Sequence, residues 1–134
     1  MLLKAKSYFF ALMPFFLAIQ GCEGNSINEC DPIFEPGLYI TVVDAATELP
    51  LSCDMEVRVL GEGEGEVLQK SREQACSEPY TFEGAFETAG TFQVMVEKTG
   101  YETWLSDEIE LRNKLGSCHI DSKMVHVELR KSEP

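Results

Sequence analysis

The sequence predicts an all-β fold, a β-sandwich of about seven strands over residues 37–131. Three observations support this fold class. From residue 37 onward, the apolar segments are short and rich in β-branched and aromatic residues, and turn residues separate them. No apolar pattern of helical period and useful length follows residue 22. A chain of 134 residues has room for one such domain.

The first predicted strand, residues 37–44 (GLYITVVD), is apolar at nearly every position. That pattern indicates a central strand covered on both sides, or a strand that twists midway. Asp44 and Thr47 can turn the chain after it with their own side chains. Residues 55–59 then alternate apolar and charged side chains, which predicts a half-buried strand.

The middle of the domain is expected to contain two loops and two further strands. The glycine-glutamate run 61–66 reads as a loop, and residues 67–68 are expected to pair back onto the preceding strand. Residues 69–79 are polar and predict a long loop. Aromatic residues mark a strand over 80–86, and residues 91–98 carry the clearest inward-facing apolar stripe.

The last third predicts a strand near residues 104–111, with a bulge at 106–107 where the apolar residues change parity. Residues 113–116 then turn the chain, and residues 118–130 form the final strand. The predicted core consists of Val57, Val59, Phe92, Val94, Val96, Trp104, Val125 and Val127.

Residues 1–21 have the features of a cleaved signal peptide. Lys4 and Lys6 form a basic start, and residues 8–19 are an unbroken apolar run. As a helix this run is about 18 Å long, well short of the ~30 Å that a spanning helix must cross.

The segment that ends at Cys22 resembles the lipobox of bacterial lipoproteins, with Ile19 three positions before the cysteine and Gly21 directly before it. This resemblance implies a diacylglyceryl thioether on Cys22 and an acylated amino terminus, so that palmitate or a similar chain anchors the protein in membrane lipid. Residues 22–36 would be the lipidated tether. Many Gram-negative lipoproteins that stay on the inner membrane carry aspartate directly after the lipidated cysteine. Glu23 at this position therefore favours the outer membrane if the cell is Gram-negative.

The charge of the chain excludes one class of partner. Without residues 1–21 it has nine Lys and Arg against 23 Asp and Glu, a net charge of about −14. Such a surface repels nucleic acid and anionic lipid headgroups, so we expect no nucleic-acid partner. Cationic ligands and divalent ions stay open.

Four cysteines remain once Cys22 is assigned to lipid: Cys30, Cys53, Cys76 and Cys118. An even number in a small exported domain favours two disulfides, and three pairings satisfy that number. None of the four has the CxxC spacing of a zinc or redox site.

Three segments, 41–51, 89–104 and 118–129, resemble the carboxypeptidase regulatory-like domain. The resemblance implies a transthyretin-like (prealbumin-like) sandwich and a non-catalytic accessory role. In the first segment Glu48 replaces the family's glycine, whereas Gly100-Tyr101 keeps the family's turn. We expect Gly90 and Gly100 to reverse the chain with positive φ, and Tyr101 to cover a core edge with its hydroxyl in water.

The family pattern also implies the disulfide pairing. In relatives a cysteine ahead of the first strand accompanies the Cys-His that opens the last one, which implies a Cys30–Cys118 bridge. The second bridge would then be local, between Cys53 and Cys76. The residues alone leave the pairing of Cys30 with Cys53 and of Cys76 with Cys118 open.

Three groups of residues are candidates for a site. Cys118, His119 and His126 could suggest a metal site, but His119 would point away from Cys118 on a strand, and His126 is expected to face solvent. The glutamates of the 61–66 loop lack the ligand pattern of a calcium loop and indicate a solvated hairpin tip. Asp44, Asp54 and Asp121 could pair with other carboxylates for acid–base chemistry, but nothing in the sequence brings them together.

The sequence therefore predicts a lipid-anchored, non-catalytic β-sandwich, a binding or structural module of the cell envelope. We expect no cofactor and no metal, and an envelope protein is the partner we consider. The alternative is an exported inhibitor or ligand-binding protein that works through the loop 69–79. The oligomeric state is not predicted.

Overall fold

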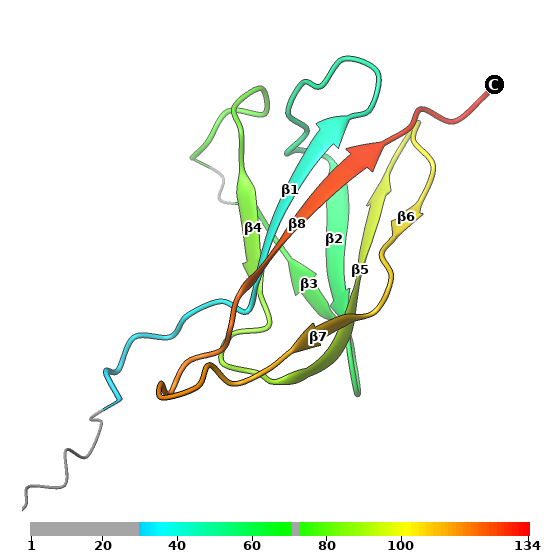
Figure 1. Ribbon diagram of the computed structural model, residues 1–134. Coiled ribbons are helices and arrows are strands. Elements are labelled where there is room, and N and C mark those ends of the chain that lie inside the picture. The colour runs from blue at the N-terminus through cyan, green and yellow to red at the C-terminus, as the bar shows by residue number, and fades with distance from the viewer. Residues whose placement is uncertain (1–29, 71–72) are drawn as a thin grey trace, which may run out of the picture.

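The computed structural model of the chain describes residues 30–70 and 73–134. These residues form eight β-strands in two sheets and no helix, which confirms the predicted all-β class (Figure 1). Within the described ranges, no helix is long and apolar enough to cross a bilayer. The strands are β1 (Leu38–Asp44), β2 (Met55–Leu60), β3 (Glu66–Leu68), β4 (Thr81–Gly84), β5 (Gly90–Lys98), β6 (Trp104–Leu105), β7 (Ile109–Leu111) and β8 (Lys123–Leu129).

The smaller sheet has the strand order β4-β1-β8, and the larger sheet has the order β3-β2-β5-β6, with β7 also paired to β5. In the smaller sheet β1 and β8 are parallel, with partners running from Leu38–Lys123 to Asp44–Leu129. Every other strand pair is antiparallel. Because β1 and β8 are parallel, both strands begin at the same end of the sandwich, where residues 30–36 approach it (Figure 1).

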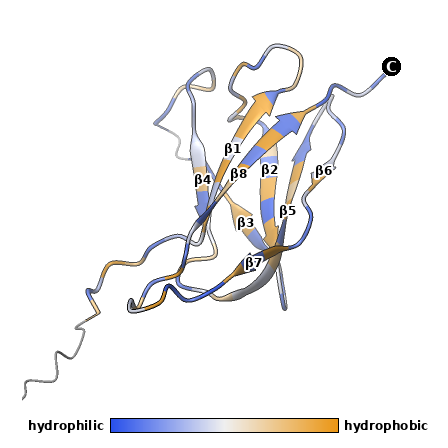
Figure 2. Cartoon of the chain, in the orientation of Figure 1, coloured by the Kyte–Doolittle hydropathy of each residue, from blue (hydrophilic) through white to orange (hydrophobic). Residues whose placement is uncertain are grey.

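The two sheets pack face to face around one hydrophobic core. Inward-facing apolar residues alternate with outward-facing polar ones over residues 55–59 of β2 and 125–129 of β8 (Figure 2). Five of the eight predicted core residues are fully buried, whereas Phe92, Trp104 and Val125 are half-buried and pack against the core. The buried side chains are Leu38, Ile40, Val42, Val57, Val59, Leu68, Phe82, Ala85, Val94, Val96, Leu111, Ile120, Val127 and Leu129.

Two strands differ from their predictions. Strand β1 is central, but it is fully buried on one face only, because Tyr39, Thr41 and Val43 lie half-exposed on the outer face. The final strand begins at Lys123 rather than at residue 118. Residues 113–120 form a hairpin instead, closed by the bridge between Asn113 and Ile120 and by the hydrogen bond from Lys114 N to His119 O (2.9 Å).

The predicted bulge at residues 106–107 is present as a break between β6 and β7. Both short strands pair with β5, and Ser106 stands between them. Its backbone N–H donates to Val94 O (2.9 Å), and its Oγ accepts from Val94 N (2.8 Å). The side chain of Ser106 therefore replaces a backbone carbonyl in the ladder.

The turn after β1 is organised by the buried carboxylate of Asp44, as the sequence indicated. Asp44 Oδ1 accepts hydrogen bonds from Ala46 N (2.9 Å) and Thr47 N (3.0 Å). Asp44 Oδ2 accepts one from the Tyr101 hydroxyl (2.8 Å), so the expectation that this hydroxyl faces water was wrong. The hydrogen bond from Tyr101, followed by those from Ala46 and Thr47, lowers the pKa of Asp44 to about 2.

Candidate functional site

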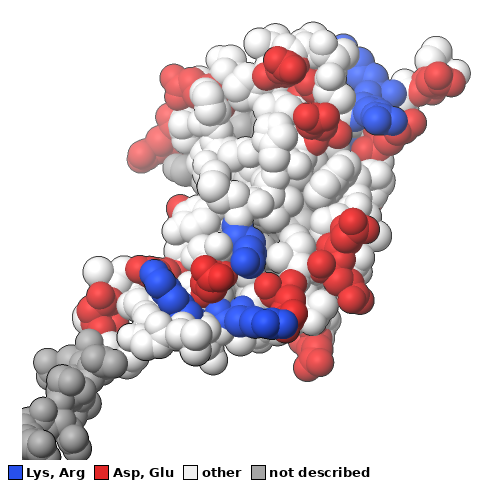
Figure 3. Space-filling view, in the orientation of Figure 1, with Lys and Arg blue, Asp and Glu red and all other residues white. Residues whose placement is uncertain are grey.

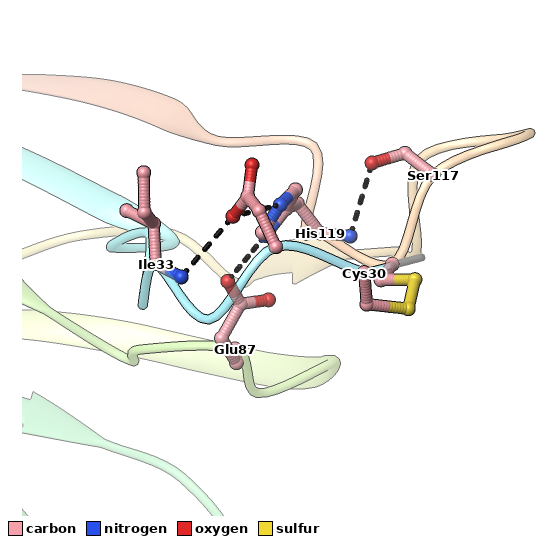
Figure 4. The surroundings of a disulfide bond; sticks show 7 residues. Cys30, Ile33, Glu87, Ser117 and His119 are labelled. Atoms are coloured by element: carbon pink, nitrogen blue, oxygen red, sulfur yellow. Dashed lines mark hydrogen bonds and ion pairs between the residues drawn. A yellow bond between two sulfur atoms is a disulfide. The ribbon is translucent and has the colours of Figure 1, made fainter. Parts of the chain in front are cut away.

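A group of interacting polar residues lies where residues 30–36 meet the sandwich. The Cys30–Cys118 disulfide joins this segment to the 113–120 hairpin, with the two Cα atoms 5.5 Å apart (Figure 4). The pairing implied by the family resemblance is thus present, as is the second bridge between Cys53 and Cys76 (Cα–Cα 5.2 Å). Disulfides of this kind are typical of proteins folded outside the cytoplasm.

His119 follows Cys118 and lies between two carboxylates (Figure 4). Its Nδ1 is 2.7 Å from Glu87 Oε1, and its Nε2 is 3.3 Å from Asp31 Oδ1. The hydrogen bond with Glu87 raises the pKa of His119, and the nearby charges of Glu35, Glu87 and Asp31 add to this effect. With a carboxylate on each ring nitrogen, the imidazolium form is favoured.

Glu87 is the centre of this group. Its Oε1 also accepts a hydrogen bond from Glu35 N (2.9 Å), while its own backbone N–H donates to Glu35 O (3.1 Å). The hydrogen bond from Glu35 N, followed by that with His119, lowers the pKa of the Glu87 carboxyl. Glu87 adopts a positive φ of 48°, a backbone conformation that is uncommon for a residue other than glycine.

We call Cys30, Asp31, Glu87, Cys118 and His119 the N-terminal clamp. It links the entering chain to two loops of the sandwich through a disulfide, an ion pair and backbone hydrogen bonds. Two further contacts continue the attachment toward β1 and β8. Ser122 Oγ donates to Pro36 O (2.7 Å), and Lys123 N donates to Gly37 O (2.8 Å).

The chemistry open to the clamp is limited by the way His119 is held. A general base needs an unprotonated ring nitrogen within reach of a nucleophile, and here each ring nitrogen faces a carboxylate. The hydroxyl of Ser117 accepts a hydrogen bond from the backbone N–H of His119 (3.1 Å). Among residues 30–70 and 73–134, no three His, Cys, Asp or Glu side chains are grouped as metal ligands.

A small hollow of about 190 Å³ lies beside the clamp, with Pro32, Ile33 and Phe34 on one side and Glu87 and His119 on the other. Drug-sized ligands occupy pockets of roughly 300–1,000 Å³. The hollow is therefore too small for such a ligand. The contacts of the clamp attach residues 30–36 to the sandwich and do not form a ligand pocket of that size.

A larger hollow of about 460 Å³ lies beside the second disulfide, lined by residues of β2 and β3 and by Gln69, Lys70, Gln74 and Cys76. Ser52 Oγ donates to Cys76 O (3.0 Å), and Lys98 Nζ donates to Cys53 O (2.6 Å), so both cysteines are tied to their surroundings. Lys70 Nζ donates to Gln74 O across the loop. This hollow has the size of a small-molecule site.

The other sequence candidates do not form a common site. His126 lies on the outer face of β8 with its side chain 60% exposed, as predicted, and its Nδ1 contacts Thr41 Oγ1 (3.1 Å). Asp44 is buried beneath its turn, Asp54 is exposed, and Asp121 forms an ion pair with Lys123 (3.5 Å).

The glutamate run behaves as predicted only in part. Glu62 and Glu64 are exposed in the loop. Glu66 is also exposed overall, but it belongs to β3, and its Oε2 accepts a hydrogen bond from Ala85 N (3.0 Å). This carboxylate thus fixes the β4–β5 loop rather than standing free at a hairpin tip.

Cys22 and the signal-peptide-like residues 1–21 lie outside the described residues.

The pairing of His119 with Glu87 was not predicted, because the two residues lie 32 positions apart on loops without periodicity. Comparison with models of protein families gave no match, and comparison with curated proteins gave none either.

Proposed function

We propose that this chain is a lipid-anchored, non-catalytic β-sandwich lipoprotein that acts as a binding or structural module of a bacterial cell envelope. The observation that carries the proposal is the N-terminal clamp. It fixes the chain to the sandwich at Cys30, only eight residues after the lipobox-like Cys22. A domain attached to a membrane through its N-terminal segment needs a firm connection at this point.

The geometry of the clamp also supports a non-catalytic role. His119 is engaged on both ring nitrogens, and the only other histidine, His126, lies on the outer sheet face beside Thr41. Asp44, whose carboxyl pKa is lowered, fixes a turn through the hydrogen bonds that it accepts from Ala46 N and Thr47 N. Shifted pKa values can mark an active site, but hydrogen bonds that hold the structure together account for those of Asp44 and His119.

The finer fold assignment that we propose is a transthyretin-like, carboxypeptidase regulatory-like sandwich. Two packed sheets with eight short strands agree with this family resemblance. Its three segments fall on the turn after β1, on β5 with the Gly100-Tyr101 turn, and on the approach to β8. Gly90 and Gly100 have positive φ values of 149° and 84°, as expected of glycines where the chain reverses.

Metabolic labelling tests the anchor. Radiolabelled palmitate should enter the full chain in a bacterial host and should be absent from the Cys22→Ser variant. The matched control is Cys53→Ser, which removes a cysteine from the sandwich and should keep the label. Equal labelling of the Cys22→Ser variant and the natural chain would refute lipidation at this residue.

The binding role is tested by cross-linking in intact cells, followed by purification of the lipidated chain from the envelope fraction. A protein recovered in stoichiometric amount supports the module. Turnover of a substrate by the purified chain that is lost in the His119→Gln variant would instead show that the clamp is catalytic.

An exported inhibitor or ligand-binding protein is the second candidate function, and the hollow of about 460 Å³ beside the loop 69–79 favours it. NMR spectra of the chain with candidate small molecules distinguish the two functions. Shifts confined to Ser52, Met55 and Gln69 would support ligand binding in this hollow, whereas unchanged signals across a broad ligand set would count against it.

A further inference from the structure

The end of the sandwich that holds the clamp exposes several large hydrophobic side chains. They lie on three neighbouring loops, 31–36, 85–90 and 113–120, which the clamp joins through its disulfide and ion pairs. Four such side chains are exposed there: Ile33 (63%), Phe34 (75%), Phe86 (40%) and Leu115 (100%). Single exposed hydrophobic residues are ordinary, but several at one end of a small domain point to an interaction surface.

Leu115 is the most exposed of them, because it occupies the tip of the 113–120 hairpin. Ser117 N donates to Lys114 O (3.1 Å), and Gly116 has a φ of 72°, which places Leu115 at the first central position of a tight turn. The preceding Lys114 side chain has no ion-pair partner among the described residues. An apolar tip beside a free ammonium group suits the boundary between lipid headgroups and acyl chains.

This end carries acidic side chains, among them Asp31, Glu35 and Glu87, as well as basic ones. Basic side chains gather there beside the entering chain (Figure 3). Arg112 pairs with Glu110 (2.7 Å) and Lys123 pairs with Asp121 (3.5 Å), so these charges largely cancel. A zwitterionic headgroup layer would therefore not repel this end, although the net charge of the whole chain disfavours an anionic one.

The length of chain before Cys30 limits how far this end can lie from an anchored Cys22. Eight residues reach at most about 29 Å when fully extended. The exposed side chains of the clamp end are thus held close to any bilayer that contains the lipid of Cys22.

Resting on the proposed lipidation of Cys22, we infer that the clamp end lies on the surface of the bilayer. Ile33, Phe34 and Leu115 enter the boundary between headgroups and acyl chains, and Lys114 lies at the level of the phosphates. The partner of this surface is a zwitterionic lipid bilayer. The anchor and the side chains together then fix the orientation of the sandwich, which presents its opposite end, with the turn after β1, away from the membrane.

The test uses the lipidated full chain in phosphatidylcholine vesicles that carry bromine on their acyl chains. Leu115→Trp places a fluorescent reporter at the hairpin tip, and Leu49→Trp is the matched control, an exposed leucine (63%) in the turn at the other end. Trp104 stays in both variants as an equal background. We expect blue-shifted emission and about threefold stronger bromine quenching for Leu115→Trp than for Leu49→Trp.

Three results would overturn the inference. Equal, water-like emission from both variants on anchored protein would refute membrane contact and leave the anchor intact. A blue shift without bromine quenching would show that protein, such as a second copy of the chain, covers this end. Failure of palmitate to label Cys22 would refute the lipoprotein proposal itself, and with it the bilayer contact that rests on it.

Discussion

Removal of the Cys30–Cys118 disulfide is expected to destabilise the sandwich more than removal of the Cys53–Cys76 disulfide. The bridged residues are 88 positions apart in the first case and 23 in the second. Chain-entropy estimates for loops of these lengths give about 4.6 and about 3.4 kcal/mol at 25 °C. Either loss is large beside the ~5–15 kcal/mol of unfolding free energy expected of a domain.

The measurement is urea-induced unfolding of two double variants, Cys30→Ala/Cys118→Ala and Cys53→Ala/Cys76→Ala, next to the natural chain. The difference in unfolding free energy between the variants should be about 1.2 kcal/mol, with the Cys30–Cys118 variant the less stable. A larger loss from the local bridge would refute the reasoning. It would show that local contacts around this bridge, such as the hydrogen bond from Ser52 Oγ to Cys76 O, outweigh the constraint on the long loop.

Three further predictions concern single side chains. Val94→Ala should lower the unfolding free energy by about 2 kcal/mol, because it removes buried methyl groups between the sheets. Tyr101→Phe should raise the pKa of Asp44 from about 2 toward its ordinary value, as measured by NMR titration of the carboxyl carbon. His119→Gln should remove the part of the pH dependence of stability that arises from the contact with Glu87, as measured by thermal unfolding across pH.

The sign of each pH effect follows from the direction of its pKa shift. Asp44 has a lowered pKa in the folded state, so its contribution is present above about pH 3.9 and is lost as the pH falls toward 2. His119 has a raised pKa, so its contribution is complete below about pH 6.5 and is lost as the pH rises through the folded-state pKa. If His119→Gln lost stability with rising pH to the same extent as the natural chain, the assignment of this effect to His119 would be refuted.

The matched control for the core variant is Val67→Ala, because Val67 lies on β3 with 46% of its surface exposed. Its replacement should change the unfolding free energy by less than about 0.5 kcal/mol. If Val94→Ala were as mild as Val67→Ala, the side chain of Val94 would not lie between the sheets. For Tyr101→Phe, an Asp44 pKa that stays near 2 would show that the backbone donors alone hold the carboxylate.

The strands that sequence analysis placed well are those with a two-residue alternation. Residues 55–60 and 90–98 alternate clearly, and both form strands that bury the predicted face. Alternation predicts such strands because successive side chains point to opposite faces, so the apolar residues mark the face that packs on the core. Strand β1 carries apolar residues on both faces, so its pattern did not show that the outer face is only partly covered.

The contacts that sequence analysis missed join residues in turns or at the ends of strands. His119 meets Glu87, and Tyr101 meets Asp44, across separations of 32 and 57 residues. Each contact depends on how two turns dock once the sheets have packed, and no periodic signal in the sequence records that docking. Glu48 shows the same limit: it adopts a positive φ of 58°, a left-handed conformation that its residue type did not predict.

If the chain is anchored at Cys22 as we propose, the parallel pairing of β1 and β8 makes the clamp well placed to hold the sandwich. A pull on the chain before Cys30 reaches the start of β1 through residues 31–37, and it reaches the start of β8 through the disulfide to Cys118. Both strands therefore receive the load at the same end and are pulled in the same direction. Because the two strands are pulled together, the hydrogen bonds between them are not sheared, and the load passes to the core that both strands bury.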